Sequence, residues 1–378
     1  MSRPTPRWLV SPSFDVALFT GPAILSVLLV WLIPGASVSG AQTPLWAWLL
    51  FVVGVDVAHV WASLYRTYLD REELARRRSL YVGTPLGCWL AGVMLYSWGP
   101  LVFWRVLAYV AVFHFVRQQY GFVALYEHRL GERGRFDRVL DRVVIYLAML
   151  YPLAFWHGSL PRSFEWFVEG DFVSVGAGVG PTVAAVAFVT ALSAFVVRQV
   201  WLLATGRPIN PGKALVVFST ALSWYVGIVL FNSDFAFTMT NVLAHGVPYF
   251  ALVWIYLRRR APDRAPEAFL ARIARPRYLP MYVGLLFAIA FLEEGAWDVL
   301  VWQEHTSVFG AWPVGGSVAG FEGALGFLVP LLAVPQATHY ILDAFLWKFD
   351  GSNPGLREAL LPAAVAEDRP PRTPELVK

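Results

Sequence analysis

The strongest constraint in this sequence is a long series of apolar segments, each about long enough to cross a lipid bilayer. A helical span needs about 20 residues to cross roughly 30 Å of hydrocarbon. We expect spans at Ala17–Ile33, Pro44–Tyr65, Tyr81–Ser97, Leu101–Tyr126, Val143–His157, Pro181–Leu203, Ala214–Phe231, Phe235–Leu257, Leu279–Leu292 and Phe321–Trp347. Only 15% of the residues are charged and 57% are hydrophobic, as is typical of membrane proteins. The sequence therefore predicts an all-α, polytopic integral membrane helix bundle of about ten transmembrane helices.

Basic residues between the predicted helices set the expected orientation. The loops at 66–78, 127–142, 205–213 and 258–277 carry 5, 5, 2 and 7 Lys and Arg residues, 19 in all, whereas the opposite loops carry Arg162 alone. Cytoplasmic loops are enriched in such residues. We therefore expect both termini to be cytoplasmic, and we place the protein in the plasma (inner) membrane of a bacterium. The net charge of +4 follows from these loops, so no nucleic-acid partner is predicted.

The domain organisation is expected to be simple. Residues 1–350 are predicted to form one transmembrane helical domain, and residues 351–378 a polar, disordered cytoplasmic tail. The single cysteine, Cys88, excludes a disulfide or a thiolate metal cluster within one chain. A basic start before the first apolar segment also matches a cleaved signal peptide, which leaves open whether the first helix is retained.

Four of the seven histidines lie inside predicted spans, where ionisable groups are unfavourable and usually functional. They are His59, His114, His245 and His339, on the second, fourth, eighth and tenth helices. They precede the expected cytoplasmic ends of these helices, near residues 66, 127, 258 and 348, by 7, 13, 13 and 9 residues. All four therefore lie roughly 10 to 20 Å below the cytoplasmic face. Four imidazoles in one layer predict a metal centre in the bundle.

Polar residues accompany these histidines at one helical turn. They are Asp56, Gln118, Asn241, Gln336 and Asp343. We predict that they orient the imidazole rings or bind the metal themselves, and that Asp56 and Asp343 are catalytic carboxylates. Arg117 is a third candidate catalytic residue, a deep cation that pairs with Asp56 or Asp343 or orients a polar end of the substrate. Pro248 and Pro335 lie near two of the histidines, where a kink opens space beside a site.

The ligand set limits the choice of metal. Without thiolates, the four histidines suit Fe(II), Zn, Mn or Cu. The ligand set alone does not select among these metals. The chain has no HxxHH motif of the kind found in the membrane di-iron hydroxylases and desaturases.

Four stretches of the chain also resemble motifs of a known family: DVAHVWASLYRTYLD, FHFVRQQY, LAHGVPYFALVW and VPQATHYILDAFLW. In order and approximate spacing they are similar to the PHGALD-like, HFG, H-x-x-x-H and late VPH…D motifs of the Brp/Blh integral-membrane β-carotene dioxygenases. The resemblance implies that His59, His114 and His245 bind iron, and that His339 and Asp343 belong to the last motif. Tyr249 stands where the family has the second histidine of its H-x-x-x-H pair, and we expect its side chain to line the substrate site.

The sequence therefore favours a membrane-embedded non-haem iron oxygenase. Its expected substrate is a lipophilic, unsaturated molecule, carotenoid-like or lipid-like, admitted from the bilayer, and membrane lipids are its other expected partners. Two further functions stay open. One is a proton-coupled or ion-coupled transporter with a relay of Asp56, Arg117, Asp343 and the histidines. The other is a zinc-dependent lipid hydrolase with Asp56 or Asp343 as general base.

Overall fold

The computed structural model describes residues 7–129, 134–311 and 322–361, and these residues form helices and connecting loops without any strand. Eight helices in this part are long and apolar enough to cross a membrane, or nine if one bent pair counts as a single span. The prediction of an all-α fold is confirmed. The number of such helices is eight or nine, where the sequence predicts about ten.

The first half of the described chain supplies five of these eight spans. Its elements are α1 (Pro12–Asp15), η1 (Val16–Thr20), α2 (Gly21–Leu32), α3 (Leu45–Ala47), η2 (Trp48–Val57), α4 (Ala58–Ala62), η3 (Ser63–Arg66), α5 (Arg71–Arg76), α6 (Arg78–Trp98), α7 (Pro100–Arg129) and α8 (Arg135–Gly158). Elements that follow without a break, such as α3, η2, α4 and η3, form one continuous span.

The second half supplies the other three spans and the bent pair. Its elements are α9 (Val179–Ala204), α10 (Pro211–Trp224), η4 (Tyr225–Leu230), α11 (Asp234–Arg260), η5 (Ala261–Asp263), α12 (Phe269–Ile273), η6 (Pro276–Tyr278), α13 (Leu279–Trp297), η7 (Asp298–Trp302), α14 (Thr306–Phe309), η9 (Glu322–Ala324), α15 (Leu325–Leu332), α16 (Val334–Leu346) and α17 (Leu356–Leu360). The ninth predicted span corresponds to α13, a helix of 19 residues that is not among the eight.

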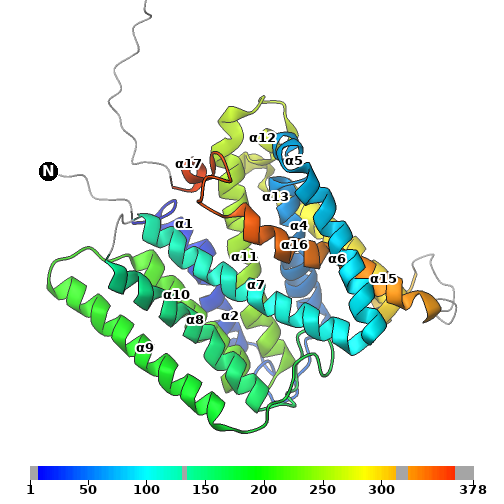
Figure 1. The fold of residues 1–378 in the computed structure, drawn as a ribbon, viewed down its shortest axis with the longest axis horizontal. Helices are drawn as coiled ribbons and strands as arrows, with labels where there is room; N and C mark the ends of the chain where they lie inside the picture. Colours follow the sequence, from blue (N-terminus) through cyan, green and yellow to red (C-terminus); the bar gives the residue numbers. More distant parts are fainter. Residues whose placement is uncertain (1–6, 130–133, 312–321, 362–378) are drawn as a thin grey trace, which may run out of the picture.

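Helix α11 is the centre of the fold. It packs against α2, η2, η4, α4 and α10, and 20 of its 27 residues are buried. Figure 1 shows α11 behind α7, which crosses the molecule diagonally, and α9 at the outer edge. In contrast to α11, only 4 of the 26 residues of α9 are buried, and α9 packs mainly on α8. A polar side chain on α11 therefore lies deep in the bundle, whereas most side chains of α9 are not buried.

The second predicted span, 44–65, is not a regular α-helix. After α3 it continues as ten residues of π-helix in η2, then as α4 and the 3₁₀ turn η3. The π-helical part packs closely on α11, because a Cβ added at Gly246 would lie 2.7 Å from the Val55 side chain and 3.0 Å from its carbonyl oxygen. Asp56 lies in η2 and His59 in α4, so the change of helix type falls between these two residues. Such π-helical turns are frequent at functional sites.

The last predicted span, 321–347, is also not one helix, and its first residue lies outside the described residues. α15 and α16 are bent by 45° with respect to each other. Pro335 lies in the first turn of α16. A proline is tolerated at that position but disfavours helical continuation through the residue before it. The bend lets α16 pack on α4, α6 and α7, which brings His339 into the bundle.

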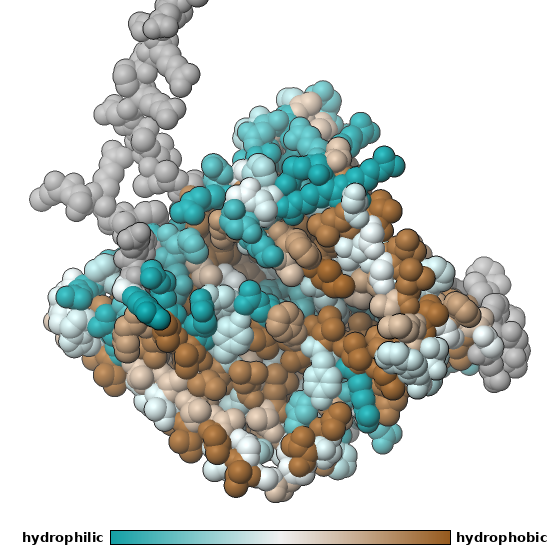
Figure 2. Space-filling view, viewed as in Figure 1, coloured by the Kyte–Doolittle hydropathy of each residue, from teal (hydrophilic) through white to brown (hydrophobic). Residues whose placement is uncertain are grey.

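The basic loops and both ends of the described chain gather at one end of the molecule. Arg259 donates hydrogen bonds to the carbonyl oxygens of Leu9, at 2.7 Å, and of Ala359, at 2.9 Å. Arg264 donates to Asp70 at 2.6 Å. Figure 1 shows α1, α5, α12 and α17 in the upper part of the view, where Figure 2 shows mostly hydrophilic surface. The loop charges thus share one end of the bundle. That this end is cytoplasmic stays a prediction.

Two expectations about polar segments differ from the structure. Lys213 was counted as a loop cation, but it is fully buried in α10 and forms an ion pair with Asp141 of α8. The tail was expected to be disordered from residue 351, but residues 356–360 form α17, and Leu356 and Leu360 are buried in the main core. The apolar side chains of this short helix explain why it packs on the bundle. Residues 362–378 lie outside the described part.

Candidate metal centre

Four buried imidazoles from four helices meet inside the bundle. His59 on α4, His114 on α7, His245 on α11 and His339 on α16 are 1%, 4%, 1% and 1% exposed. The Nε2 atoms of His59 and His245 lie 3.1 Å apart. The ring centroids of His114 and His339 are 4.7 Å apart. The ring centroids of His59 and His339 are 5.0 Å apart, and those of His114 and His245 are 5.1 Å apart.

The nitrogen positions are close to those of a metal site. One ligand atom from each of His59, His114 and His339 lies within 4.8 Å of the other two. Nitrogen ligands sit about 2.1 Å from Zn or a similar ion, so two ligands of one ion lie up to about 4.2 Å apart. His245 adjoins this triad through its contact with His59. A set of imidazoles suits iron, zinc, copper or nickel.

Most ring nitrogens of the cluster lack a hydrogen-bond partner in the described part of the chain. Five of the eight are buried and unpaired: Nδ1 of His59, Nε2 of His114, Nδ1 of His245 and both nitrogens of His339. Each buried group left without a partner costs about 1 to 3 kcal/mol. A metal ion would take the lone pair of one nitrogen per ring, which for His59 leaves Nδ1 beside Asp56, whereas helix packing alone gives no reason to leave so many nitrogens unpaired. The residues present therefore fit a metal ion.

Two carboxylates lie on the outer side of the cluster. Oδ1 of Asp56 is 3.6 Å from Nδ1 of His59. Asp343 was expected to orient His339 on its own helix, but its Oδ2 lies 3.9 Å from Nδ1 of His114 on α7. The difference arises because α16 packs against α7, so a side chain one turn beyond His339 meets the neighbouring helix. A carboxylate beside the outer nitrogen is the usual support of a histidine that binds metal.

Asp343 is itself held by two neighbours. It accepts a hydrogen bond from the Tyr249 hydroxyl at 2.7 Å and another from Trp347 Nε1 at 3.2 Å. Tyr249, predicted to line the site, thereby reaches the cluster through Asp343, and its ring centroid is 5.0 Å from that of His339. Phe115 stacks on His245 with ring centroids 3.5 Å apart. These contacts restrict rotation of the imidazole rings.

Pro248 leaves one carbonyl group of α11 without its helical donor, and two glutamines of α7 donate hydrogen bonds to this part of the helix. Proline has no N–H, so the carbonyl group of Ala244, four residues earlier in α11, loses its helical donor. Gln119 of α7 supplies one, since its Nε2 lies 3.1 Å from that oxygen. Gln118 was expected to contact His114, but its Nε2 donates to the carbonyl oxygen of His245 at 2.8 Å. Both glutamines thus link α7 to α11 around Pro248. Gln119 was missed, although a proline inside a buried helix could have indicated such a donor.

Arg117 does not belong to the cluster. It is exposed, and its Nη1 donates a hydrogen bond to the hydroxyl group of Tyr146 on α8 at 2.7 Å. The prediction that it pairs with Asp56 or Asp343 is therefore wrong. The reason is the helical register of α7, which turns Arg117 toward α8 while His114 faces the interior.

The last two predicted residues, Asn241 and Gln336, lie about one turn before a clustered histidine on the same helix. Asn241 is buried on α11, and its Nδ2 donates to the carbonyl oxygen of Phe237 at 3.0 Å within the same helix. Gln336 is half-buried on α16, one turn before His339. A further residue that sequence reasoning did not select is Glu293 of α13, whose Oε2 accepts a hydrogen bond from Trp61 Nε1 at 2.6 Å.

A cleft of about 220 Å³ reaches the cluster from the side. Its walls come from α4, η3, α6 and the start of α16: Val60, Trp61, Ser63, Leu64, Tyr68, Pro85, Val334, Pro335, Thr338 and His339. Most of these side chains are apolar. Only Tyr81 and Gly92 of α6 are buried, so the cleft connects a peripheral helix to one of the four imidazoles.

Comparisons with protein-family models, with curated proteins and with solved structures found no match to this chain. The resemblance to the carotene dioxygenases therefore rests on the four sequence motifs alone. The fold and site define a helical bundle of the membrane type with a buried histidine cluster that could hold a metal ion.

Proposed function

We propose that this chain is a membrane-embedded metal-dependent enzyme, a non-haem iron oxygenase that acts on a lipophilic, unsaturated substrate. The observation that carries the proposal is the meeting of four buried imidazoles, five of whose ring nitrogens lack a partner in the described residues. His59, His114, His245 and His339 would hold the metal. The preference for iron over zinc rests on the motif resemblance.

The surroundings of the cluster support an apolar substrate. The cleft is lined mainly by apolar side chains, includes His339 in its wall, and adjoins the peripheral helix α6. A polyene chain entering there would place a double bond next to the cluster. Bound Fe(II) would supply the activation of O2. Cleavage of one C=C bond by O2 leaves one oxygen atom in each of two carbonyl products, so this reaction needs no external reductant.

The residues around the metal have separable roles in this proposal. Asp56 and Asp343 lie beside the outer nitrogens of His59 and His114 and would hold those rings in their ligating orientation. Tyr249 and Trp347 fix Asp343. The apolar walls of the cleft exclude water and align the chain of the substrate.

The decisive experiment is metal quantification on purified protein. Wild type, His339→Ala and a control, His157→Ala, are compared after purification in mild detergent; His157 lies on α8 and bonds to Tyr109 outside the cluster. We expect stoichiometric iron in wild type and control, and its loss in His339→Ala. Bleaching of a carotenoid under O2 should follow the same pattern. Absence of stoichiometric metal, together with unchanged activity in all four His→Ala variants, would reject the proposal.

A zinc-dependent hydrolase is a second candidate, and one observation favours it. The Asp56 side chain lies against His59 and keeps 35% of its surface exposed, which leaves space beside it for a small molecule such as a water. Zinc in place of iron, with hydrolysis of a lipid ester in the absence of O2, would select this alternative.

We further propose that the basic end of the bundle faces the cytoplasm of a bacterial cell. The proposal is supported by the loop charges and by their gathering at one end. A reporter that is active only in the periplasm should be inactive when fused after Lys378. Periplasmic activity of this fusion would reverse the orientation.

A further inference from the structure

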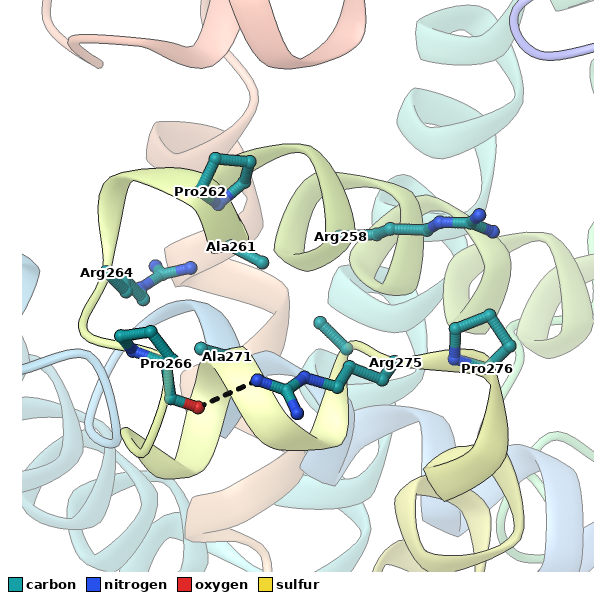
Figure 3. A pocket seen from close by; sticks show the side chains of 9 residues that line it. Arg258, Ala261, Pro262, Arg264, Pro266, Ala271, Arg275 and Pro276 are labelled. Carbon is teal, nitrogen blue, oxygen red and sulfur yellow. Dashed lines mark hydrogen bonds between the residues drawn. The ribbon is translucent and has the colours of Figure 1, made fainter.

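A second hollow, of about 330 Å³, lies at the basic end of the molecule. Figure 3 shows it between the C-terminal end of α11 and α12, with Arg264 on one side and Arg258 and Pro276 on the other. Arg275 reaches along α12 toward Pro266. The complete lining is Arg258, Ala261, Pro262, Arg264, Pro266, Ala271, Ala274, Arg275 and Pro276.

Three guanidinium groups line this pocket, and their hydrogen-bonding capacity is only partly used. Arg264 pairs with Asp70 at 2.6 Å, but its Nη1 is buried without a hydrogen-bond partner in the described structure. Arg275 donates to the carbonyl oxygen of Pro266 at 3.0 Å. Arg258 lies 5.1 Å from the ring centroid of Trp254. Among the described residues, neither Arg258 nor Arg275 forms an ion pair, so the pocket carries excess positive charge.

The surroundings of this pocket combine exposed apolar, aromatic and basic side chains. The exposed side chains of Phe269 and Leu279 lie at the starts of α12 and α13, and Arg277 lies over the Tyr278 ring at 4.8 Å. Exposed apolar, aromatic and basic side chains occur together where membrane proteins meet the lipid headgroups.

We propose that this pocket binds a phosphate group, either that of an anionic phospholipid or that of a soluble phosphate. Guanidinium groups match phosphate oxygens with paired N–H donors, and they bind phosphate more specifically than lysine does. Arg258 and Arg275 would supply the donors, and the Arg264 guanidinium would add positive charge at the wall. Ala271 and Pro276 provide apolar contact at the rim.

A phosphate group bound there would connect the two segments that carry His59 and His245, half of the histidine cluster. α11, which holds His245, ends at one wall of the pocket. Arg264 at another wall is bonded to Asp70, in the loop that follows the span holding His59. An occupied pocket should therefore raise the thermal stability of the bundle.

The test compares matched pairs of arginine variants. Arg258→Gln/Arg275→Gln removes two charges from the pocket, and Arg272→Gln/Arg277→Gln removes two from the same segment outside its lining. Melting temperatures of detergent-purified full-length protein are measured with added phosphatidylglycerol, phosphatidylcholine or inorganic phosphate. The single variant Arg258→Gln, at an exposed position, replaces the first pair if that pair does not fold.

We expect phosphatidylglycerol or inorganic phosphate to raise the melting temperature of wild type and of the outside pair. The pocket pair should lose this response, with apparent affinity reduced about tenfold or more. A response to phosphatidylglycerol alone identifies a lipid ligand, and a response to inorganic phosphate identifies a soluble one. No response in wild type, or equal responses in both pairs, overturns the proposal. Metal content is measured in parallel, so this outcome is independent of the histidine cluster.

Discussion

His59 and His245 direct their Nε2 atoms at each other across 3.1 Å, although they are 186 positions apart in the chain. The contact depends on the close approach of η2 and α4 to α11. Gly246, the residue after His245, permits this approach because any side chain there would meet Val55. Two neutral imidazoles at this distance can share one hydrogen bond, which still leaves Nδ1 of each ring buried and unpaired in the described structure.

The two carboxylates beside the cluster should control metal affinity. Asp56→Asn and Asp343→Asn keep the size of the side chain but remove the charge that supports His59 or His114. Loss of such a support weakens metal binding by about 10-fold to 100-fold. Competition with a chelator of known affinity measures this change. Asp263→Asn, at an exposed position of η5 that pairs with Arg260, is the control and should bind metal as wild type does.

Blocking the cleft should reduce turnover without removing the metal. Val334→Trp places a large ring in the wall of the cleft, which Trp61 and Leu64 also line. We expect kcat/KM for a long polyene to fall at least about tenfold, since the substrate can no longer align, while metal content stays unchanged. Val200→Trp, on the exposed face of α9, is the matched control. Equal kcat/KM in both variants would show that substrate reaches the cluster by another route.

The bond from Gln119 to Ala244 should be coupled energetically to Pro248. Gln119→Leu leaves the Ala244 carbonyl oxygen without a donor and also breaks the contact with Thr220 at 3.1 Å. We expect a loss of about 1 to 2 kcal/mol in the free energy of unfolding, measured by denaturant titration in detergent micelles. In a Pro248→Ala background the restored N–H can satisfy the carbonyl, so the loss should be smaller. Equal losses in both backgrounds would contradict this explanation.

Glu73 of α5, outside the membrane spans, should make stability depend on pH. Burial alone would raise its pKa, but hydrogen bonds from Arg76 and Tyr81 and the charge of Arg66 lower the pKa below its usual 4.5. The ionised group therefore stabilises the fold above about pH 4.5, and this stability is lost as the pH falls through the folded pKa. The melting temperature of wild type should fall more steeply below about pH 5 than that of Glu73→Gln. Parallel curves for both proteins would argue against the effect.

The helical class and the identity of the clustered histidines could be read from the sequence because both depend on contiguous segments. Long apolar runs predict spans, and a histidine inside such a run can be identified without knowing which helices surround it. His59, His114, His245 and His339 were selected in this way, and the structure places all four together. The basic loops could also be read from contiguous segments of the sequence, and they gather at one end of the structure.

Contacts across helices could not be read in this way. Asp343 was paired with His339 by helical spacing, yet it faces His114, because the bend before Pro335 sets how α16 crosses α7. Arg117 looked equally deep in the sequence, but the rotation of α7 turns it toward Tyr146. Hydropathy indicates how far along a span a residue lies, but it carries little information on which face of a helix contacts which neighbouring helix.

The sequence by itself therefore determined which segments are apolar helices and which rare polar residues lie inside them. Only the tertiary structure decided that η2 is π-helical, that Gly246 lets α4 and α11 approach, and that Gln119 replaces the donor lost at Pro248. The physical reason is the range of the forces involved. Burial of apolar surface acts on each segment separately, whereas hydrogen bonds and close packing depend on residues brought together from distant parts of the chain.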